Sequence, residues 1–176
     1  MSSPTIVNVV ATTELGQSVD LAQVSQLPDT IFDHEIYGGR VAYLKKPGMR
    51  GKVTIFPSGK LISVGTKSPK EAEADLQEAA DTLHHEGLIK SVKVEVRLHN
   101  IVAVLATKPL DLEEVAYMTG AIYEPEQFPA AILKTGSPKR TYLIFNSGKV
   151  VMPGVRSMAD LDEAVRLITG LLDSIN

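Results

Sequence analysis

The segment IFPSGK at residues 55–60 decides the fold, because it returns as IFNSGK at residues 144–149. A second block keeps the same order: VNVVA at residues 7–11 returns as HNIVA at residues 99–103. The two offsets are 89 and 92 residues, so the copies differ by only a few inserted residues. Self-similarity over a fixed distance is the mark of one structural unit written twice.

The repeats predict two halves of similar structure. We expect the first half at residues 5–87, the second at residues 97–175, and a connector at residues 88–96. A chain of 176 residues with 44% hydrophobic residues has enough apolar material for both halves to build a core.

Each half has the same predicted order of elements. A β-rich segment comes first, followed by a short helix with Asp20 or Asp111 as its N-cap. A long helix closes each half and begins at Ser68 or Ser157. The apolar stripes that we expect to pack inward are Leu76, Ala79, Ala80 and Leu83 in the first long helix and Leu161, Val165, Leu167, Ile168, Leu171 and Leu172 in the second. Between the two helices we expect three strands in each half, at 37–46, 52–56 and 60–65 and at 128–135, 140–145 and 149–154. Strands that follow one another through tight turns pair antiparallel, so the fold class is α+β.

The strands are more apolar than a sheet with helices on one face requires. Such a sheet alternates apolar and polar residues, yet residues 6–10 read IVNVV and residues 142–145 read YLIF. The face opposite the helices is therefore expected to be an exposed apolar surface with a few polar points. A sheet covered on both sides in a dimer is the alternative.

The charges are segregated along the chain. Residues 36–70 contain eight Lys or Arg and residues 128–156 contain five, and neither stretch contains an acid. Residues 71–87 contain six acids and no Lys or Arg. A basic rim around an apolar face suits a polyanion, although the formal net charge is −3, because local fields govern a screened contact. Lysines that protect strand edges are the alternative.

Composition excludes several classes of protein. The chain contains no cysteine, so a disulfide framework, a thiol nucleophile and a cysteine metal site are excluded. No apolar run approaches the ~20 residues of a membrane span, and the N-terminus has no targeting pattern, so we expect an intracellular protein without a membrane partner. His84 and His85 are adjacent on a helix and cannot share a metal ion. We expect no catalytic residues, no metal and no cofactor.

The motifs together resemble the TATA-box-binding protein family. The twin IFxSGK segments, the repeated Asn-(Ile/Val)-Val start and the run YEPEQFP at residues 123–129 carry the resemblance, which covers nearly the whole chain. The resemblance implies two pseudo-symmetric repeats that form one curved, saddle-shaped antiparallel sheet with helices on the convex face. It also implies a general transcription initiation factor of the archaeal type. Such a factor binds A·T-rich promoter DNA in the minor groove, wedges aromatic side chains between base steps and bends the duplex. A cytoplasmic, nucleoid-associated location follows.

The resemblance assigns a role to residues in both halves. The DNA wedges fall on Tyr37, Phe56, Phe128 and Phe145. Base-edge and groove-floor contacts fall on Asn8, Val10, Thr54, Ile62, Val64, Asn100, Val102, Leu143, Val151 and Pro153. Phosphate contacts fall on Ser58, Lys60, Lys67, Lys134, Ser147, Lys149 and Arg156.

Five residues depart from the family pattern, and one of them is Thr54, which stands where a leucine would be expected. Tyr37 replaces a wedge phenylalanine, so that wedge carries a hydroxyl that needs water or a partner. Val64 and Pro153 replace two central threonines, and Tyr43 replaces an arginine. The departures predict a weaker or more permissive binder, with the first half more affected.

The resemblance also implies protein partners. Transcription factor B is expected to contact Glu124, Glu126 and Gln127, and through it the RNA polymerase pre-initiation complex. The alternative is a saddle-fold protein-interaction module with weak or lost DNA binding, and an accessory domain of an enzyme is a remote third hypothesis. Self-association of the free protein through the apolar face is left open.

Overall fold

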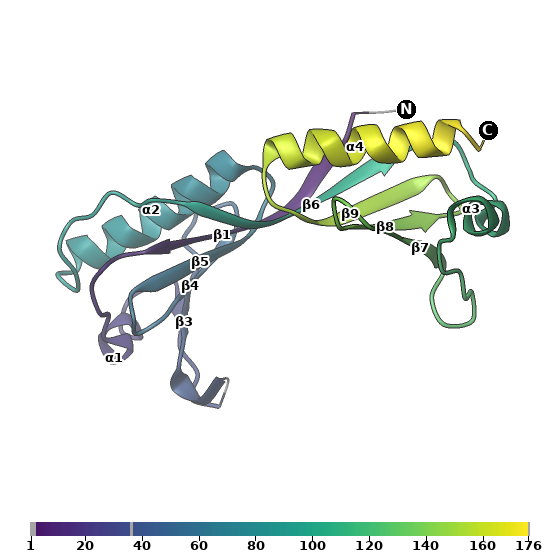
Figure 1. The fold of residues 1–176 in the computed structure, drawn as a ribbon. Coiled ribbons are helices and arrows are strands. Elements are labelled where there is room, and N and C mark those ends of the chain that lie inside the picture. The colour runs from purple at the N-terminus through teal and green to yellow at the C-terminus, as the bar shows by residue number, and fades with distance from the viewer. Residues whose placement is uncertain (1–2, 36, 176) are drawn as a thin grey trace. The chain divides into compact units, whose positions relative to one another are not determined.

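A computed structural model describes residues 3–35 and 37–175 (Figure 1). In this part of the chain nine strands form one open antiparallel sheet, and four α-helices complete an α+β fold, as expected. The chain divides into two compact units. The first unit is Asn8–His99, and the second is Asn100–Asn176 together with Met1–Val7.

The first unit carries a long helix on a sheet whose strand order is β2-β3-β4-β5-β1 (Figure 1). Its elements are β1 (Thr5–Glu14), α1 (Leu21–Val24), β2 (Thr30–Ile31), a 3₁₀ turn at Tyr37–Gly39, β3 (Ala42–Leu44), β4 (Lys52–Ile55), β5 (Lys60–Thr66) and α2 (Pro69–His85). Asp20 caps α1 through its side chain, which accepts a hydrogen bond from the Ala22 N–H.

The second unit repeats this plan with the strand order β6-β9-β8-β7. Its elements are β6 (Arg97–Ala106), α3 (Leu112–Thr119), β7 (Ala130–Thr135), β8 (Arg140–Phe145), β9 (Lys149–Val155) and α4 (Met158–Asp173). Asp111 caps α3 as predicted, by accepting from the N–H groups of Glu113 and Glu114.

The long helices begin where the sequence predicts. The Ser68 and Ser157 hydroxyls accept hydrogen bonds from the N–H groups of Glu71 and Asp160. The predicted apolar stripe of α2 is buried, whereas α4 buries Ala164 and leaves Leu167 40% exposed. The expectation that Leu167 packs inward is therefore wrong. In the described residues, no helix is both long and apolar enough to cross a bilayer.

The repeated Ser-Gly turns form tight hairpins in both units. The Gly59 N–H donates to the Phe56 carbonyl and the Gly148 N–H to the Phe145 carbonyl. Both glycines have positive φ, +85° and +82°. A Cβ at Gly59 would lie 1.9 Å from a backbone oxygen, and one at Gly148 would lie 2.3 Å from another. Glycine is required at both turns because no side chain fits there.

Two predicted strand starts are wrong. Tyr37–Gly39 is a 3₁₀ turn in which all three residues have positive φ, so the strand expected from residue 37 begins at Ala42. Consecutive glycines allow this left-handed backbone, which interrupts pairing. Phe128 likewise precedes β7, because Pro129 cannot donate a ladder hydrogen bond.

Candidate nucleic-acid interface

The sheet face opposite α2 in the first unit is formed by alternate residues of its strands. Val53, Ile55 and Leu61 are fully buried, whereas the residues between them remain partly exposed. The half-buried residues include the predicted floor residues Asn8, Val10, Thr54, Ile62 and Val64, with Phe56 just beyond β4. They are brought together across the strands, since Thr54 pairs with Ile62 and Val10 with Val64.

The second unit presents a face built in the same way. Ile144, Val150 and Met152 are buried against the helix side, and their sequence neighbours are half-buried on the other side. The half-buried set contains all of the predicted floor residues of this half: Asn100, Val102, Leu143, Val151 and Pro153. Leu143 pairs directly with Val151.

Val104 belongs to the same face, but the sequence-based prediction did not include it. It is half-buried and pairs with Val151. The alternation Asn100, Val102, Val104 was the signal that could have found it.

An asparagine sits in a matched hydrogen bond on each face. The Asn8 Oδ1 accepts from the Gly65 N–H at 2.9 Å, and the Asn100 Oδ1 accepts from the Gly154 N–H at 2.8 Å. Both glycines have positive φ, and the ladders of β1 and β6 shift register near these points. Because the carbonyl oxygen of each amide is held by a glycine, the NH₂ group is what each asparagine offers outward.

The aromatic side chains lie at the outer end of each face. Phe128 and Phe145 are in edge contact, with ring centroids 6.2 Å apart and planes at 64°. In the first unit, Tyr37 and Phe56 line one hollow of about 450 Å³. Tyr37 is 66% exposed and Phe128 is 38% exposed, so both predicted wedge positions are accessible.

Tyr37 and Tyr43 line the same hollow. Burial, and then the proximity of the Tyr37 phenol, raise the pKa of Tyr43. The Lys52 ammonium lies 4.2 Å from the Tyr43 ring centroid, in a cation–π contact. Two of the departures from the family pattern therefore occur as one interacting pair. Arg40 and Val41 also line the hollow, and no sequence pattern predicted them there.

The residues expected at phosphate are accessible to solvent. Ser58, Lys67, Lys134, Ser147, Lys149 and Arg156 are exposed, and Lys60 is half-buried. Lys60 lies on the same side of β5 as Ile62, and Lys149 on the same side of β9 as Val151, by strand alternation. These two ammonium groups therefore border the apolar floors.

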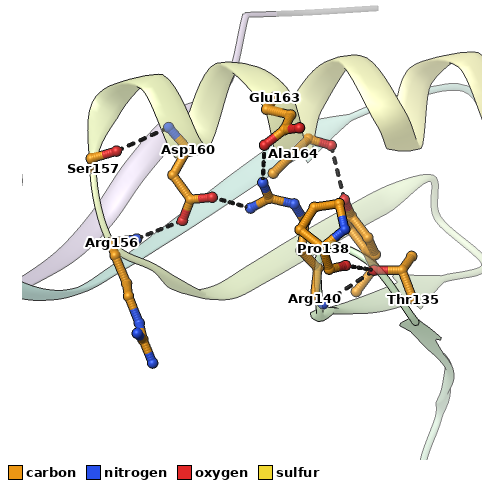
Figure 2. Close-up of polar contacts among 9 residues, drawn as sticks. Thr135, Pro138, Arg140, Arg156, Ser157, Asp160, Glu163 and Ala164 are labelled. Atoms are coloured by element: carbon orange, nitrogen blue, oxygen red, sulfur yellow. Dashed lines mark hydrogen bonds and ion pairs between the residues drawn. The ribbon is translucent and has the colours of Figure 1, made fainter.

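Not all of the basic residues are available to a polyanion. The Lys46 Nζ is 2.5 Å from the Glu78 carboxylate, and the Lys45 Nζ donates to two backbone carbonyls at 2.7 Å. The Arg140 side chain, 7% exposed, is ion-paired with Asp160 and Glu163 of α4 (Figure 2). The interpretation of both basic stretches as a free rim is wrong for these residues, which stabilise the fold.

The Arg140 cluster also lowers the pKa of one of its acids, Asp160. Partial burial alone would raise the pKa of Asp160, but hydrogen bonds from the Arg156 N–H and the Arg140 guanidinium hold it below its usual value (Figure 2). Burial would lower the pKa of Arg140, and its hydrogen bond with Asp160 raises it instead. This cluster is structural, because its charges are directed at one another.

The Glu-Pro-Glu segment at residues 124–126 of the second unit is exposed at a turn. Glu124 and Glu126 are exposed, as is Gln127, whose N–H donates to the Glu124 carbonyl at 2.9 Å.

The described residues include no group of three or more potential metal ligands. His99 bonds to the Thr12 hydroxyl at 2.9 Å and His84 to the Ile89 carbonyl at 3.1 Å, so each has a structural contact.

The duplicated fold and its two apolar faces define a class: proteins that bind a partner on an open antiparallel sheet. Residues 3–85 and 95–175 match the family model described as transcription factor TFIID, or TATA-binding protein. The chain belongs to the TATA-box-binding protein family, whose members are DNA-binding transcription factors and not enzymes.

Individual relatives agree with this assignment. The TATA-box-binding protein of Cenarchaeum symbiosum is 39% identical over 175 residues, covering 98% of this chain and 94% of that protein. That of Methanocaldococcus jannaschii is 37% identical over 174 residues, covering 97% and 92%. The solved structure of Methanococcus jannaschii TBP matches with a TM-score of 0.85 at 31% identity, covering 98% of this chain and 99% of that one.

Proposed function

We propose that this chain is an initiation factor that binds A·T-rich promoter DNA in the minor groove, inserts aromatic side chains between base steps and bends the duplex. Residues 5–87 and 97–175 act as its two binding repeats, joined by residues 88–96. It works in the cytoplasm, associated with the nucleoid.

The matched asparagines carry this proposal. In the minor groove an A·T pair presents only acceptors, at adenine N3 and thymine O2. Asn8 and Asn100 each have their oxygen tied to a glycine N–H and offer an NH₂ donor beside an apolar floor. Donors set in a hydrocarbon surface fit A·T edges and have nothing to accept from the extra guanine amine.

The aromatic pairs supply the bending step. Insertion of an apolar ring unstacks a base step at a cost of a few kcal/mol, which contacts along the bent duplex offset. Phe128 and Phe145 touch and are both accessible, so they can enter a step together. Tyr37 and Phe56 are the corresponding pair of the first unit.

A gel-shift assay with a permuted-site bending assay tests the proposal. Phe145→Ala should lower affinity for a TATA-like duplex by at least about tenfold and reduce the bend angle. Tyr117→Ala, which removes an 88% exposed aromatic ring from α3, is the matched control and should change neither. Undiminished binding and bending by Phe145→Ala would refute the wedge role. If the parent protein binds no A·T-rich duplex, the protein-interaction module becomes the better hypothesis.

Salt dependence gives a second test. Lys60 and Lys149 border the apolar floors, and contacts with phosphate release counterions. Affinity should therefore fall by at least about tenfold between 50 and 200 mM salt, despite the net charge of −3. A flat salt response would contradict phosphate binding.

Transcription factor B is the proposed protein partner, at Glu124, Glu126 and Gln127, and it brings RNA polymerase to the promoter. All three residues are exposed on one turn. Glu124→Lys with Glu126→Lys should abolish the ternary complex with transcription factor B while DNA binding alone persists. Glu113→Lys with Glu114→Lys on α3 is the control of equal charge change.

A further inference from the structure

The two faces differ in hydroxyl content at three matched positions. Strand pairing aligns two of them, because Tyr43 pairs with Thr54 in the first unit just as Ile132 pairs with Leu143 in the second. The third position is the wedge that precedes β3 or β7. At all three positions a residue with a hydroxyl in the first unit corresponds to a hydrocarbon residue in the second. The pairs are Tyr37 and Phe128, Tyr43 and Ile132, and Thr54 and Leu143.

The three hydroxyl residues lie around one space. Tyr37, Tyr43 and Thr54 all line the hollow of about 450 Å³, together with Phe56, Ile62 and Val64. Two additional residues separate Tyr37 from Tyr43, compared with Phe128 and Ile132. The glycine turn at Tyr37–Gly39 takes up this extra length and brings the Tyr37 side chain to Tyr43.

Hydroxyls change what the face can recognise. Each hydroxyl has one donor and two acceptor lone pairs. When one phenol donates to another, the pair keeps one free donor and three free lone pairs, so it remains mainly an acceptor. The Thr54 hydroxyl adds further acceptor capacity. The second-unit positions, which are hydrocarbon, have none.

We propose that the first-unit face accepts a G·C pair within its half of the DNA site, whereas the second-unit face requires A·T pairs. This inference rests on the proposed minor-groove function. The guanine N2 amine is the only donor on the minor-groove edge. Against hydrocarbon it loses its hydrogen bond to water without replacement, but in the hollow it can donate to Tyr37, Tyr43 or Thr54. These three residues are therefore determinants of specificity.

Duplexes with one G·C pair in either half of an A·T site test the inference. The chain has no cysteine, so a single cysteine at Pro57 or Asn146, both exposed turn residues, can carry a DNA-cleaving label. The first-unit label should cut next to the half that contains G·C, whichever half that is. G·C under the first unit should lower affinity by less than about threefold, and G·C in both halves by at least about tenfold.

A triple variant separates the hydroxyls from the shape of the hollow. Tyr37→Phe, Tyr43→Phe and Thr54→Val together keep the volume and remove the three hydroxyls. In this variant the affinity ratio between the all-A·T and the singly substituted duplex should rise to at least about tenfold. Tyr117→Phe, which removes an exposed hydroxyl from α3, should leave the ratio as in the parent.

The outcomes are distinct. If the parent binds no all-A·T duplex, the proposed function fails. If it binds such a duplex but the label shows no preferred orientation, or the triple variant keeps the parent's ratio, the function stands and the inference is overturned.

Discussion

In both units carboxylates of the long helix accept hydrogen bonds from the sheet side, but the donors differ. In the first unit the donors are backbone groups: the buried Asp75 carboxylate of α2 accepts from the Arg50 N–H at 3.1 Å and the Gly51 N–H at 2.6 Å. In the second unit the strand supplies a side-chain donor: the Arg140 guanidinium reaches the carboxylates of Asp160 and Glu163 on α4 (Figure 2).

Gly51 and Arg140 occupy corresponding places, because Gly51 directly precedes β4 and Arg140 is the first residue of β8. A repeated fold thus requires a polar attachment between helix and sheet at this place but does not prescribe its residues. Backbone donors need a close approach and hence a glycine. A long arginine side chain reaches the helix without one.

Gly51→Ala tests the attachment of α2 in the first unit. A Cβ at Gly51 would lie 2.4 Å from the Val64 carbonyl oxygen and 2.9 Å from a Thr66 methyl carbon. We expect the free energy of unfolding to fall by about 3 kcal/mol or more, because backbone must move. Urea unfolding followed by circular dichroism measures it.

Gly136→Ala in the second unit is the matched control. Nothing lies within 4 Å of a Cβ built there, so stability should change by no more than about 0.5 kcal/mol. Equal losses in the two variants would show that close approach at Gly51 is unimportant.

Asp75→Ala removes the acceptor that α2 contributes to the same attachment. It leaves the N–H groups of Arg50 and Gly51 without their acceptor, in a place where Asp75 is 3% exposed. The expected loss in free energy of unfolding is about 2–3 kcal/mol. Glu73→Ala, an exposed acid on the same helix, should cost no more than about 0.5 kcal/mol. A loss below 1 kcal/mol for Asp75→Ala would mean that water replaces the carboxylate.

The Arg140 attachment should instead be sensitive to acid. The pKa of Asp160 is below its usual value in the folded state, although burial opposes this, because the Arg156 N–H and Arg140 donate to it. A lowered folded-state pKa contributes stability above the unfolded value of about 4, and that stability is lost as the pH falls through the folded value.

Arg140→Met tests this expectation. Near pH 7 the variant should be less stable than the parent by about 2 kcal/mol, because removing one partner leaves the partly buried Asp160 and Glu163 carboxylates without their counter-ion. Between pH 5 and pH 3 the variant should lose less stability than the parent. Urea titrations at the two pH values measure the difference, and parallel losses would assign the acid sensitivity to other carboxylates.

Local sequence signals predicted much of the fold and of the candidate site. The N-caps at Ser68 and Ser157, the hairpin glycines Gly59 and Gly148 and the period-two strand pattern each depend on a few neighbouring residues. Such features follow from backbone geometry alone. Strand alternation therefore placed the floor residues on the correct side of each sheet.

Tertiary contacts could not be predicted in this way. The sequence does not show that the Arg140 side chain pairs with an acid on α4 rather than pointing into solvent, because both conformations are compatible with the same strand position. Nor does it show that Tyr37 lies on a glycine turn against Tyr43, since the strand pattern runs through that segment. Both errors concern side chains whose partners lie elsewhere in the chain.

The N-caps of the long helices have the same chemistry in the two units, and their loss should have the smallest effect on the free energy of unfolding. Ser68 accepts from the Glu71 N–H at 3.1 Å and Ser157 from the Asp160 N–H at 3.0 Å. Ser68→Ala and Ser157→Ala should each lower the free energy of unfolding by about 1 kcal/mol, and by similar amounts, because the same N-terminal donor is left without its acceptor. Ser174→Ala, beyond the end of α4, is the control and should cost less. A twofold or larger difference between the two cap variants would show that the acids bonded to the Lys67 and Arg156 N–H groups compensate unequally for the lost cap.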